Sequence, residues 1–584
     1  MTQHDELATL LHQIAEESLR LLAHFQKNPA MLAESLDPWM TFGNNLQTLS
    51  GMLAMNPADI LSRQAAFWSD ATTLWQKQCE LWMQGQSLPL DDPRFSSEEW
   101  QENPFFSVLA QFYLLASEHA VRLVEKLPIQ DVKMAHKLRF FVRQYLDALS
   151  PANFPATNPK LFAETVHSRG LNLLRGLQNF LEDIDRDSAS LVMRMTDMRA
   201  FTVGKNIAAT EGEVIYRNEL MEIIQYTAKT PRTRTIPLLI VPPWINKYYV
   251  LDLSAHNSFI GWLVSKGITV FTISWVNPGP ELANTAMCDY LQNGSLRAIE
   301  VVREQMGCET VNTLGFCIGG TLLAMTLAWL AAGDTAPVAS ATFLATLIDF
   351  SEPGDIGVYI DDALLEKLEA DMQSKGFLDG RLMAQAFNSL RANDLVWSFF
   401  IKNYLQGRAQ VPFDILYWNA DSTNMPAKMH SQYLRWMYLH NDLVKPGKIR
   451  CNGRALNIGT ITIPTFFVAT EKDHIAPWRS VWKGFQKIGG DKQFLLGGSG
   501  HIAGIINPPA SNKYHYCVNP NIPKAADKWL DAAERFEGSW WPEWLKWLKV
   551  HSGGNKKAPI FDALPLKSLG SAPGTYVLKK SGLS

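Results

Sequence analysis

Three residues of this chain, Cys317, Asp473 and His501, are of the types that perform nucleophilic catalysis. A cysteine thiolate attacks a carbonyl carbon, and a histidine takes up or returns the proton. A carboxylate then fixes the tautomer and the orientation of the imidazole. Nucleophile, acid and histidine in this order along a chain are typical of one α/β architecture. The chemistry that such a set predicts is transfer of an acyl group through a sulfur-bound intermediate.

The cysteine stands between two glycines in the pentapeptide GFCIG, which begins at Gly315. An apolar, strand-like run precedes it and an apolar, helix-forming run follows it. A nucleophile on such a strand-to-helix turn is strained, and its neighbours two residues away must be small so that strand and helix can approach. The start of the helix favours the thiolate over the thiol. The motif alone leaves a catalytic Cys317 and a small buried hydrophobe equally open, because G-x-C-x-G also occurs by chance at buried turns.

The acid and the histidine each follow a later apolar run. Asp473 comes just after residues 461–470, and His501 follows residues 492–498 in its own loop. Taken singly, Asp473 is explained as a solvated turn carboxylate or a helix cap, and His501 as a loop histidine bonded to backbone. Because the ends of parallel strands meet at one edge of a sheet, their joint order and placement favour a catalytic set with Cys317.

Two backbone N–H groups are expected to stabilise an oxyanion beside this set. The first belongs to Ile318, the residue after the nucleophile. The second should come from the loop after an early strand, where Pro242–Pro243 cannot donate and Trp244 or Ile245 is the candidate. His474 is a poor choice for the catalytic histidine because it directly follows Asp473. It is explained equally well as a residue of a substrate channel and as a structural loop histidine.

The elements that must position these residues follow an alternating strand and helix pattern from about residue 200 onward. Such a rhythm predicts a mainly parallel sheet covered by helices on both faces. The runs that predict buried strands are 236–243, 268–275, 310–316, 338–346, 461–470 and 492–498.

About 110 residues separate the fourth of these strands from the fifth. They contain helical patterns and an irregular, aromatic-rich stretch, so we expect a cap at about 350–455 over the ends of the strands. Residues 1–200 repeat apolar side chains at helical spacing and predict a mainly helical N-terminal domain. The sequence therefore predicts an α/β-hydrolase fold over 201–584, with a cap inserted between two late strands and a helical domain before it.

Composition excludes several classes of protein. The 584 residues carry a net charge of −3, which gives no reason to expect nucleic acid as a partner. The start has acidic residues and no signal-peptide pattern, and the longest apolar stretch is too short to span a bilayer. The six cysteines are scattered without CxxC spacing, which argues against a zinc site and a disulfide framework and fits a reducing cytoplasm. No metal site is predicted.

Several segments together resemble the class I poly(3-hydroxyalkanoate) synthases. These segments are GFCIGGT, VPPWINKYYVLDL, WNADSTNMP, EKDHIAPW, GSGHIAGIINPP and GSWWPEW. The resemblance runs from about residue 95 to the C-terminus, whereas the first 90 residues match only in general character. It assigns Cys317 as nucleophile, His501 as general base and Asp473 as the third member, and it implies that Trp244 bears on substrate size.

The resemblance also implies a function. Such enzymes polymerise (R)-3-hydroxyacyl-CoA, here chiefly short monomers such as 3-hydroxybutyryl-CoA, into polyester with release of CoA. CoA thioester is the substrate, so no cofactor is expected. The implied partners are the growing chain, the surface of storage granules in the cytoplasm, a second copy of the chain in a homodimer, and phasin-type granule proteins. The helical N-terminal domain is then expected to serve granule, partner or dimer contacts.

Two alternatives compete with this interpretation. The first is a cysteine-dependent thioesterase or polyester hydrolase on the same fold, which the three catalytic residues alone do not exclude. The second is a non-catalytic granule or scaffold protein. The intact Cys–Asp–His set argues against the second, and the aromatic cap together with the quoted motifs argues against the first.

Overall fold

The computed structural model describes residues 3–27, 57–127, 129, 131–184, 193–333 and 335–580. By its internal contacts the chain divides into two compact units. Unit 1 comprises residues 1–197 together with 391–411, and unit 2 comprises 198–390 together with 412–584. Residues 391–411, which lie within the expected cap range, thus group with the helical unit. Within the described residues we find no helix that is both long enough and apolar enough to span a bilayer.

Unit 1 is helical. Its α-helices are α1 (Gln3–Lys27), α3 (Pro57–Met83), α4 (Glu98–Glu102), α5 (Pro104–Glu125), α6 (Val132–Ala148), α7 (Pro159–His167), α8 (Leu171–Glu182) and the short α15 (Ser398–Phe400). Polar side chains cap several of these helices in the expected way. Asn103, Asp131 and Asn158, for example, accept hydrogen bonds from the first free N–H groups of α5, α6 and α7. Part of the predicted N-terminal domain, residues 28–56, lies outside the described residues.

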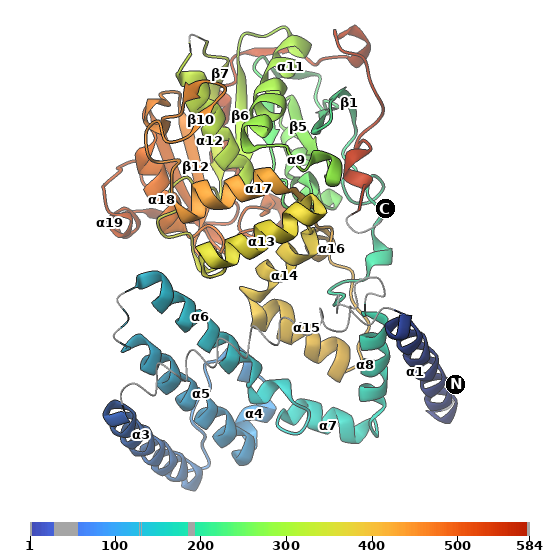
Figure 1. Cartoon of the computed structure of the whole chain (residues 1–584), viewed down its shortest axis with the longest axis vertical. Helices are drawn as coiled ribbons and strands as arrows, with labels where there is room; N and C mark the ends of the chain where they lie inside the picture. The colour runs from blue at the N-terminus through green and yellow to red at the C-terminus, as the bar shows by residue number, and fades with distance from the viewer. Residues whose placement is uncertain are drawn as a thin grey trace. The chain divides into compact units, whose positions relative to one another are not determined.

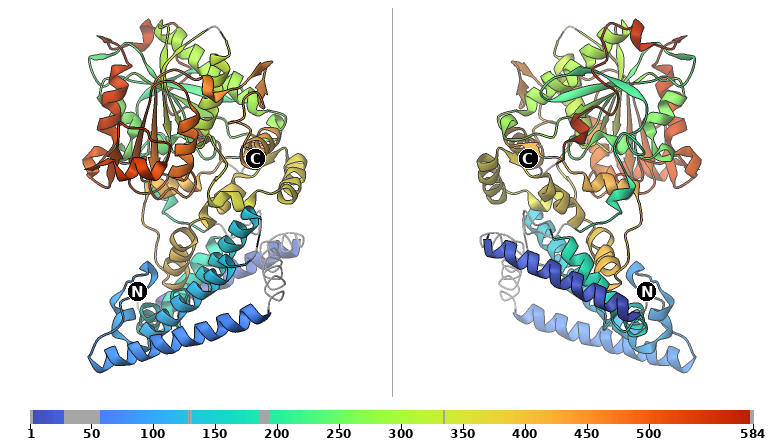
Figure 2. Two further views of the ribbon diagram at one scale, coloured as in Figure 1. Left: turned by 90° about the vertical axis from the view of Figure 1, so that its left-hand side faces the viewer. Right: turned by 90° about the vertical axis from the view of Figure 1, so that its right-hand side faces the viewer.

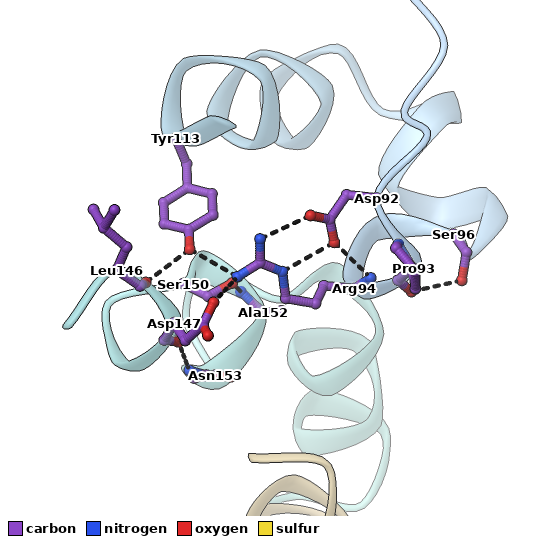
Figure 3. A network of polar contacts seen from close by, with 10 residues as sticks. All are labelled: Asp92, Pro93, Arg94, Ser96, Tyr113, Leu146, Asp147, Ser150, Ala152 and Asn153. Carbon is purple, nitrogen blue, oxygen red and sulfur yellow. Dashed lines mark hydrogen bonds and ion pairs between the residues drawn. The ribbon is translucent and has the colours of Figure 1, made fainter. Parts of the chain in front are cut away.

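A polar network holds α5 and α6 together inside unit 1 (Figure 3). The guanidinium of Arg94 donates to Asp92 at 2.7 Å, to Asp147 at 2.9 Å and to the hydroxyl of Tyr113 at 2.8 Å. That hydroxyl in turn donates to the carbonyl of Leu146 at 2.7 Å. Because each polar group in the network has a partner, partial burial of this arginine does not leave an uncompensated charge.

Unit 2 is built on a ten-stranded mixed sheet in the order β1-β2-β5-β4-β6-β7-β12-β13-β14-β15 (Figure 1). The six strands from β5 to β13 are parallel, and the two at each edge pair antiparallel. The strands are β1 (Gly212–Arg217), β2 (Met221–Tyr226), β4 (Leu238–Val241), β5 (Val270–Trp275), β6 (Val311–Phe316), β7 (Val338–Leu344), β12 (Thr465–Thr470), β13 (Lys492–Gly497), β14 (His515–Val518) and β15 (Glu534–Glu537).

Helices cover both faces of this sheet (Figure 2). One hydrophobic core joins the sheet to α11 (Arg297–Met306), α12 (Ile318–Ala331) and α18 (Trp478–Lys487). A second core on the opposite face joins it to α9 (Phe259–Ser265) and α20 (Trp541–Val550). Every residue of the central strands β4, β5, β6 and β12 is buried, which explains why these runs are apolar without alternation.

The six strands expected from the sequence are present as β4, β5, β6, β7, β12 and β13, and the predicted α/β-hydrolase fold is confirmed. The four antiparallel edge strands were not predicted. In β15 every side chain is exposed, so this strand carries no apolar signal. The α/β sheet is therefore mixed, whereas the alternating rhythm by itself suggested parallel pairing.

The cap in unit 2 follows β7 and precedes β12, and these two strands are neighbours in the sheet. Its helices are α13 (Asp362–Lys375), α14 (Gly380–Ser389), α16 (Asp414–Ala420) and α17 (Ala427–Tyr433), which lie at one end of the strands (Figure 1). A π-helical turn, η11 (Leu434–Leu439), continues α17. Two short antiparallel ladders, β8 (Phe377–Leu378) with β9 (Met425–Pro426) and β10 (Arg450–Cys451) with β11 (Arg454–Ala455), complete it.

One expectation about the cysteines is wrong. Cys288, in the short helix α10 (Met287–Asp289), and Cys451, in β10, form a disulfide across 163 residues. The remaining four cysteines of the chain, all of them described, are free. Spacing in the sequence did not reveal the pair, because chain folding rather than local sequence brings two distant cysteines together.

Candidate active site

Cys317 sits at the sharp turn between β6 and α12. Its backbone has φ 52° and ψ −125°, a conformation that a residue with a side chain rarely adopts. Two contacts hold this strained turn. The N–H of Cys317 donates to the carbonyl of Leu344 at 2.9 Å, and its own carbonyl accepts from Gly320 at 2.9 Å. Strain of this kind persists where the surrounding structure determines it, and it is common at catalytic nucleophiles.

The two glycines of the GFCIG motif are required by close backbone contacts. A Cβ at Gly315 would lie 2.4 Å from the Cα of Gly320, at the start of the helix. A Cβ at Gly319 would lie 2.2 Å from the carbonyl oxygen of Val241, at the end of β4. Both distances are far below van der Waals contact. The glycines therefore let strand, helix and the loop after β4 meet at the cysteine, as the motif predicted.

His501 and Asp473 meet in the structure although 28 residues separate them. Nδ1–H of His501 donates to Oδ2 of Asp473 at 2.8 Å, and both side chains are buried. The other oxygen of Asp473 accepts from the N–H groups of Ile475 at 2.9 Å and Ala476 at 2.8 Å. The carboxylate is thus held in a fixed orientation by its own loop, and it in turn orients the imidazole.

The imidazole of His501 also interacts with Cys317. Burial by itself lowers the pKa of His501, because it disfavours the charged ring. Electrostatic interactions with Asp473 and Cys317, together with hydrogen bonds to both, outweigh burial and raise the pKa of His501 to about 10. The imidazolium is then the dominant form near neutral pH. The structure thus joins the three residues that the sequence singled out, in the order cysteine, histidine, aspartate.

The loop that carries His501 is held by tryptophans from the segment GSWWPEW. Nε1–H of Trp540 donates to the carbonyl of Gly504 at 2.9 Å, and Nε1–H of Trp541 donates to Ile505 at 2.9 Å. Both indoles are buried in the core that includes α20. These two tryptophans therefore fix the position of the loop that carries His501.

The expected oxyanion donors lie on the two segments that meet at the turn of Cys317. Ile318 is the first residue of α12, where backbone N–H groups have no partner within the helix. The loop of Trp244 and Ile245 follows β4, whose end touches Gly319. Trp244 itself is buried against Trp275 and Tyr290, with ring centroids 5.8 and 4.8 Å away.

Ile245 and His474, which were also predicted for the site, lie in different places. Ile245 lines an apolar pocket in the cap, together with Tyr433 and Tyr438. His474 is half-buried, and its carbonyl lies against Gly354 in the segment that opens the cap. His474 is not among the described residues that line this pocket.

Sequence reasoning missed three cap residues, His430, Tyr433 and Tyr438. After burial, the tyrosine pKa values are raised further by charges that include the Cys317 thiolate, so both rings lie near the sulfur. Tyr433 ends α17 and Tyr438 lies in the π-helical turn that continues it. In an α-helix residues five apart point in different directions, whereas the wider π turn, with its i→i+5 hydrogen bonds, brings them nearer to one side. Their rings are 5.6 Å apart. In the sequence these residues show only the largely apolar face of a helix, and core packing explains such a face equally well.

One described group of side chains has the composition of a metal site. The ligand atoms of Glu471, His515 and Cys517 lie within 4.8 Å of one another. Nε2 of His515 is 3.0 Å from Oε1 of Glu471, so two of the three already pair with each other. None of its three side chains takes part in the hydrogen bond between His501 and Asp473.

Fold and site together define an α/β-hydrolase-fold protein with a cysteine, histidine and aspartate at the carboxyl ends of its strands. Comparison with known proteins narrows this class. Residues 91–263 match the family model "Poly-beta-hydroxybutyrate polymerase (PhaC) N-terminus", and residues 253–508 match the model "alpha/beta hydrolase fold".

Curated relatives match over most of the chain. A poly(3-hydroxyalkanoate) polymerase subunit PhaC of Rhizobium meliloti (strain 1021) is 45% identical over 84% of this chain and 80% of that protein. A poly(3-hydroxyalkanoate) polymerase of Methylorubrum extorquens is 44% identical over 88% and 85%, respectively. The subunit PhaC of Cupriavidus necator is 38% identical over 95% and 96%. The chain belongs to the poly(3-hydroxyalkanoate) polymerase family, and it is a transferase that makes polyester.

Proposed function

We propose that this polymerase is a class I enzyme that polymerises (R)-3-hydroxyacyl-CoA, chiefly short units such as 3-hydroxybutyryl-CoA, through an acyl thioester on Cys317. The observation that carries the proposal is the position of His501, which is bonded to Asp473 on one side and interacts with the Cys317 sulfur on the other. Family membership supports the substrate class, because the curated relatives are named for the same polymer.

The first half-reaction loads the acyl group. The Cys317 thiolate attacks the carbonyl carbon of the CoA thioester, and a bond forms from sulfur to carbon. The N–H groups of Ile318 and of the Trp244–Ile245 loop stabilise the oxyanion. The bond to the CoA sulfur then breaks, and the leaving thiolate takes the proton from the His501 imidazolium. The products are free CoA, acylated Cys317 and neutral His501.

The second half-reaction forms the ester. Neutral His501 takes the proton from the 3-hydroxyl group of an incoming unit or chain end as its oxygen attacks the acyl thioester. The bond from carbon to the Cys317 sulfur breaks, which restores the thiolate and the imidazolium. Asp473 keeps the imidazole in the tautomer and orientation that both proton transfers need. This mechanism uses side chains and the CoA thioester alone, so we propose no metal or redox cofactor.

Exchange between two thioesters is nearly isoenergetic, which suits a thiol better than a serine for holding a growing chain. Water must be kept from the acylated cysteine, since hydrolysis would release a free acid. The cap supplies apolar side chains near the sulfur, and we propose that His474 lies on the route by which substrate reaches it.

Further partners belong to the same proposal. We propose that the protein works in the cytoplasm at the surface of polyester granules, as a homodimer, and that phasin-type granule proteins contact it. In unit 1 the helix α3 supports a contact with an apolar phase, because Trp68 is 62% exposed and Trp75 is 47% exposed. Deletion of the first 90 residues should then reduce granule association more than it affects the chemistry at Cys317.

The test of the reaction is a product assay with 3-hydroxybutyryl-CoA. The purified chain should release CoA and form insoluble polyester at the same time. Release of CoA with soluble 3-hydroxybutyrate as the sole product would identify a thioesterase instead.

The test of the nucleophile compares two cysteines. Cys317→Ala should lower CoA release by about 10⁴-fold or more, because the covalent step is lost. Cys308→Ala is the matched control, since Cys308 is a free, half-buried thiol outside the site. Cys451 does not serve as a control because it forms a disulfide. Equal loss in both variants would remove the assignment of Cys317.

A further inference from the structure

The cap of unit 2 contains an apolar pocket of about 260 Å³, near the lower end of the range for small-molecule sites, about 300–1,000 Å³. Residues of helices α13, α14 and α17 and of the turn η11 line it. Among the described residues that line it, none carries an aspartate, glutamate, lysine or arginine side chain. Aliphatic and aromatic side chains predominate, with three tyrosines and His430 as the polar members.

His430 is the polar group of this lining that lacks a partner. It is 1% exposed, and within the described structure neither ring nitrogen has a hydrogen-bond partner. The other polar members are paired, since the hydroxyl of Tyr359 bonds to Ser389 at 2.7 Å and those of Tyr433 and Tyr438 bond to each other. A buried polar group without a partner is rare in folded proteins, and it points to a group that arrives from outside the chain.

The charge state of His430 limits what that group can be. Burial lowers the pKa of His430 to about 4, so the ring is neutral at physiological pH. A neutral imidazole offers one N–H donor and one acceptor nitrogen, and it does not attract an anion. The phosphates of CoA are therefore poor occupants of this pocket, whereas an uncharged chain with hydrogen-bond acceptors fits it.

Two tyrosines connect the pocket to the surroundings of Cys317. Tyr433 and Tyr438 line the pocket, and an electrostatic interaction with Cys317 contributes to the raised pKa of each. Ile245, from the loop proposed to stabilise the oxyanion, also lines it. The pocket and the surroundings of Cys317 thus share these residues, which places the pocket beside the proposed acyl thioester.

We propose that this pocket holds the ester-linked units next to the thioester on Cys317, and that the N–H of His430 donates a hydrogen bond to an ester carbonyl of that chain. The inference rests on the proposed function and specifies where the growing product lies. A polyester carries acceptors along its length and no donors except at its hydroxyl end, so a single neutral donor among apolar walls matches it. A water molecule would need two to four polar partners, and His430 alone is unpaired in this lining.

The experiment compares two CoA thioesters of equal length with the full-length protein. One carries a dimer of 3-hydroxybutyrate, which has an internal ester. The other is its ether analogue, in which the internal carbonyl is replaced by CH₂. In wild type we expect kcat/KM for CoA release to favour the ester by about 3- to 10-fold, the worth of one net hydrogen bond.

Three variants test whether His430 is the donor. His430→Leu should bring the ratio of the two kcat/KM values close to one, and His430→Gln, which keeps an N–H donor, should retain part of the preference. His440→Leu is the matched control, because His440 is exposed at the end of the same helical segment. It should leave the ratio unchanged. Thermal unfolding of each variant checks that the fold is intact.

The outcomes separate this inference from the proposed function. A ratio near one in wild type, or an unchanged ratio in both His430 variants, would overturn the role of His430 while the polymerase chemistry stands. An equal loss for both thioesters in His430→Leu and His430→Gln would assign the ring to packing alone. No release of CoA from either compound by wild type would instead contradict the proposed mechanism at Cys317.

Discussion

The backbone conformation of Cys317 and the charges around this residue both affect its sulfur atom. The positive φ of this residue lifts the side chain out of the turn, and two glycines allow the neighbouring backbone to approach. His501, held by Asp473, supplies a positive charge beside the sulfur. Because a thiolate is the reactive form of cysteine, a positive charge at this position favours the chemistry proposed for Cys317.

Replacement of Asp473 should change the titration of His501. In Asp473→Asn one of the charges that raise the pKa of His501 is lost, while burial still lowers it. We expect the pKa to fall from about 10 by about one to three pH units. Nitrogen chemical shifts of the imidazole, followed by NMR against pH, measure this directly, with the exposed His440 as an internal reference.

The raised pKa of His501 also determines how the free energy of unfolding changes with pH. The folded-state pKa of His501 lies above the unfolded value of about 6.5. At pH values below about 6.5, the imidazolium therefore contributes its full stabilisation to the folded state. This contribution is lost as the pH rises through about 10. An unchanged imidazole titration in Asp473→Asn would show that the carboxylate does not set the charge of His501.

At the scale of elements, a buried ion pair ties the cap to the loop after β4. Nζ of Lys247 lies 2.8 Å from Oδ1 of Asp421, which follows α16, and both side chains are almost fully buried. The hydroxyl of Tyr249 donates to the other oxygen of Asp421 at 2.7 Å. Lys247 also donates to the carbonyl of Val577 at 2.7 Å. The loop that carries Trp244 and Ile245 is therefore joined to the cap by charge as well as by packing.

Loss of one partner of this pair should be costly. Lys247→Met leaves the carboxylate of Asp421 buried without its counter-charge, and we expect the free energy of unfolding to fall by about 3–5 kcal/mol. The double variant Lys247→Met/Asp421→Asn should recover part of that loss. Lys445→Met is the control, since its pair with Asp442 is exposed and is worth about 1 kcal/mol or less. Chemical denaturation measures all three, and equal small effects would contradict a structural role for the buried pair.

At the scale of the whole molecule, bonds between segments that are distant in the sequence stabilise unit 2. The disulfide from Cys288 to Cys451 joins the segment before α11 to the end of the cap, across 163 residues. The buried carboxylate of Glu222 in β2 accepts from the N–H groups of Thr575 at 3.0 Å and Tyr576 at 3.1 Å. The C-terminal segment is thus fastened to the edge of the sheet.

The disulfide predicts a thiol count. Denatured protein without reductant should titrate four thiols, and reduced protein should titrate six. Cys288→Ser should lower the free energy of unfolding by about 2–4 kcal/mol, because the bridge closes a long loop. Cys79→Ser, which removes a free thiol, is the control. Six thiols without reductant would show that the two sulfurs are not bonded in the isolated protein.

Much of the fold could be predicted because its signals are local. The six central strands are continuous apolar runs, and the GFCIG motif marks the turn at Cys317. The order of strands and loops placed Asp473 and His501 at one edge, where the structure has them in contact. The edge strand β15 was missed because all its side chains are exposed, and a solvated strand carries no apolar pattern.

The sequence by itself therefore determined the six central strands and the three residues on which the proposed chemistry depends, because periodicity and motif spacing are properties of neighbouring residues. The resemblance of its motifs indicated the family. Only the tertiary structure decided that Cys288 pairs with Cys451 and that His430 faces an apolar pocket without a partner. Both depend on which distant segments meet. In the same way, the raised pKa of His501 depends on Asp473 and Cys317, two residues distant in the chain whose interactions outweigh the effect of burial.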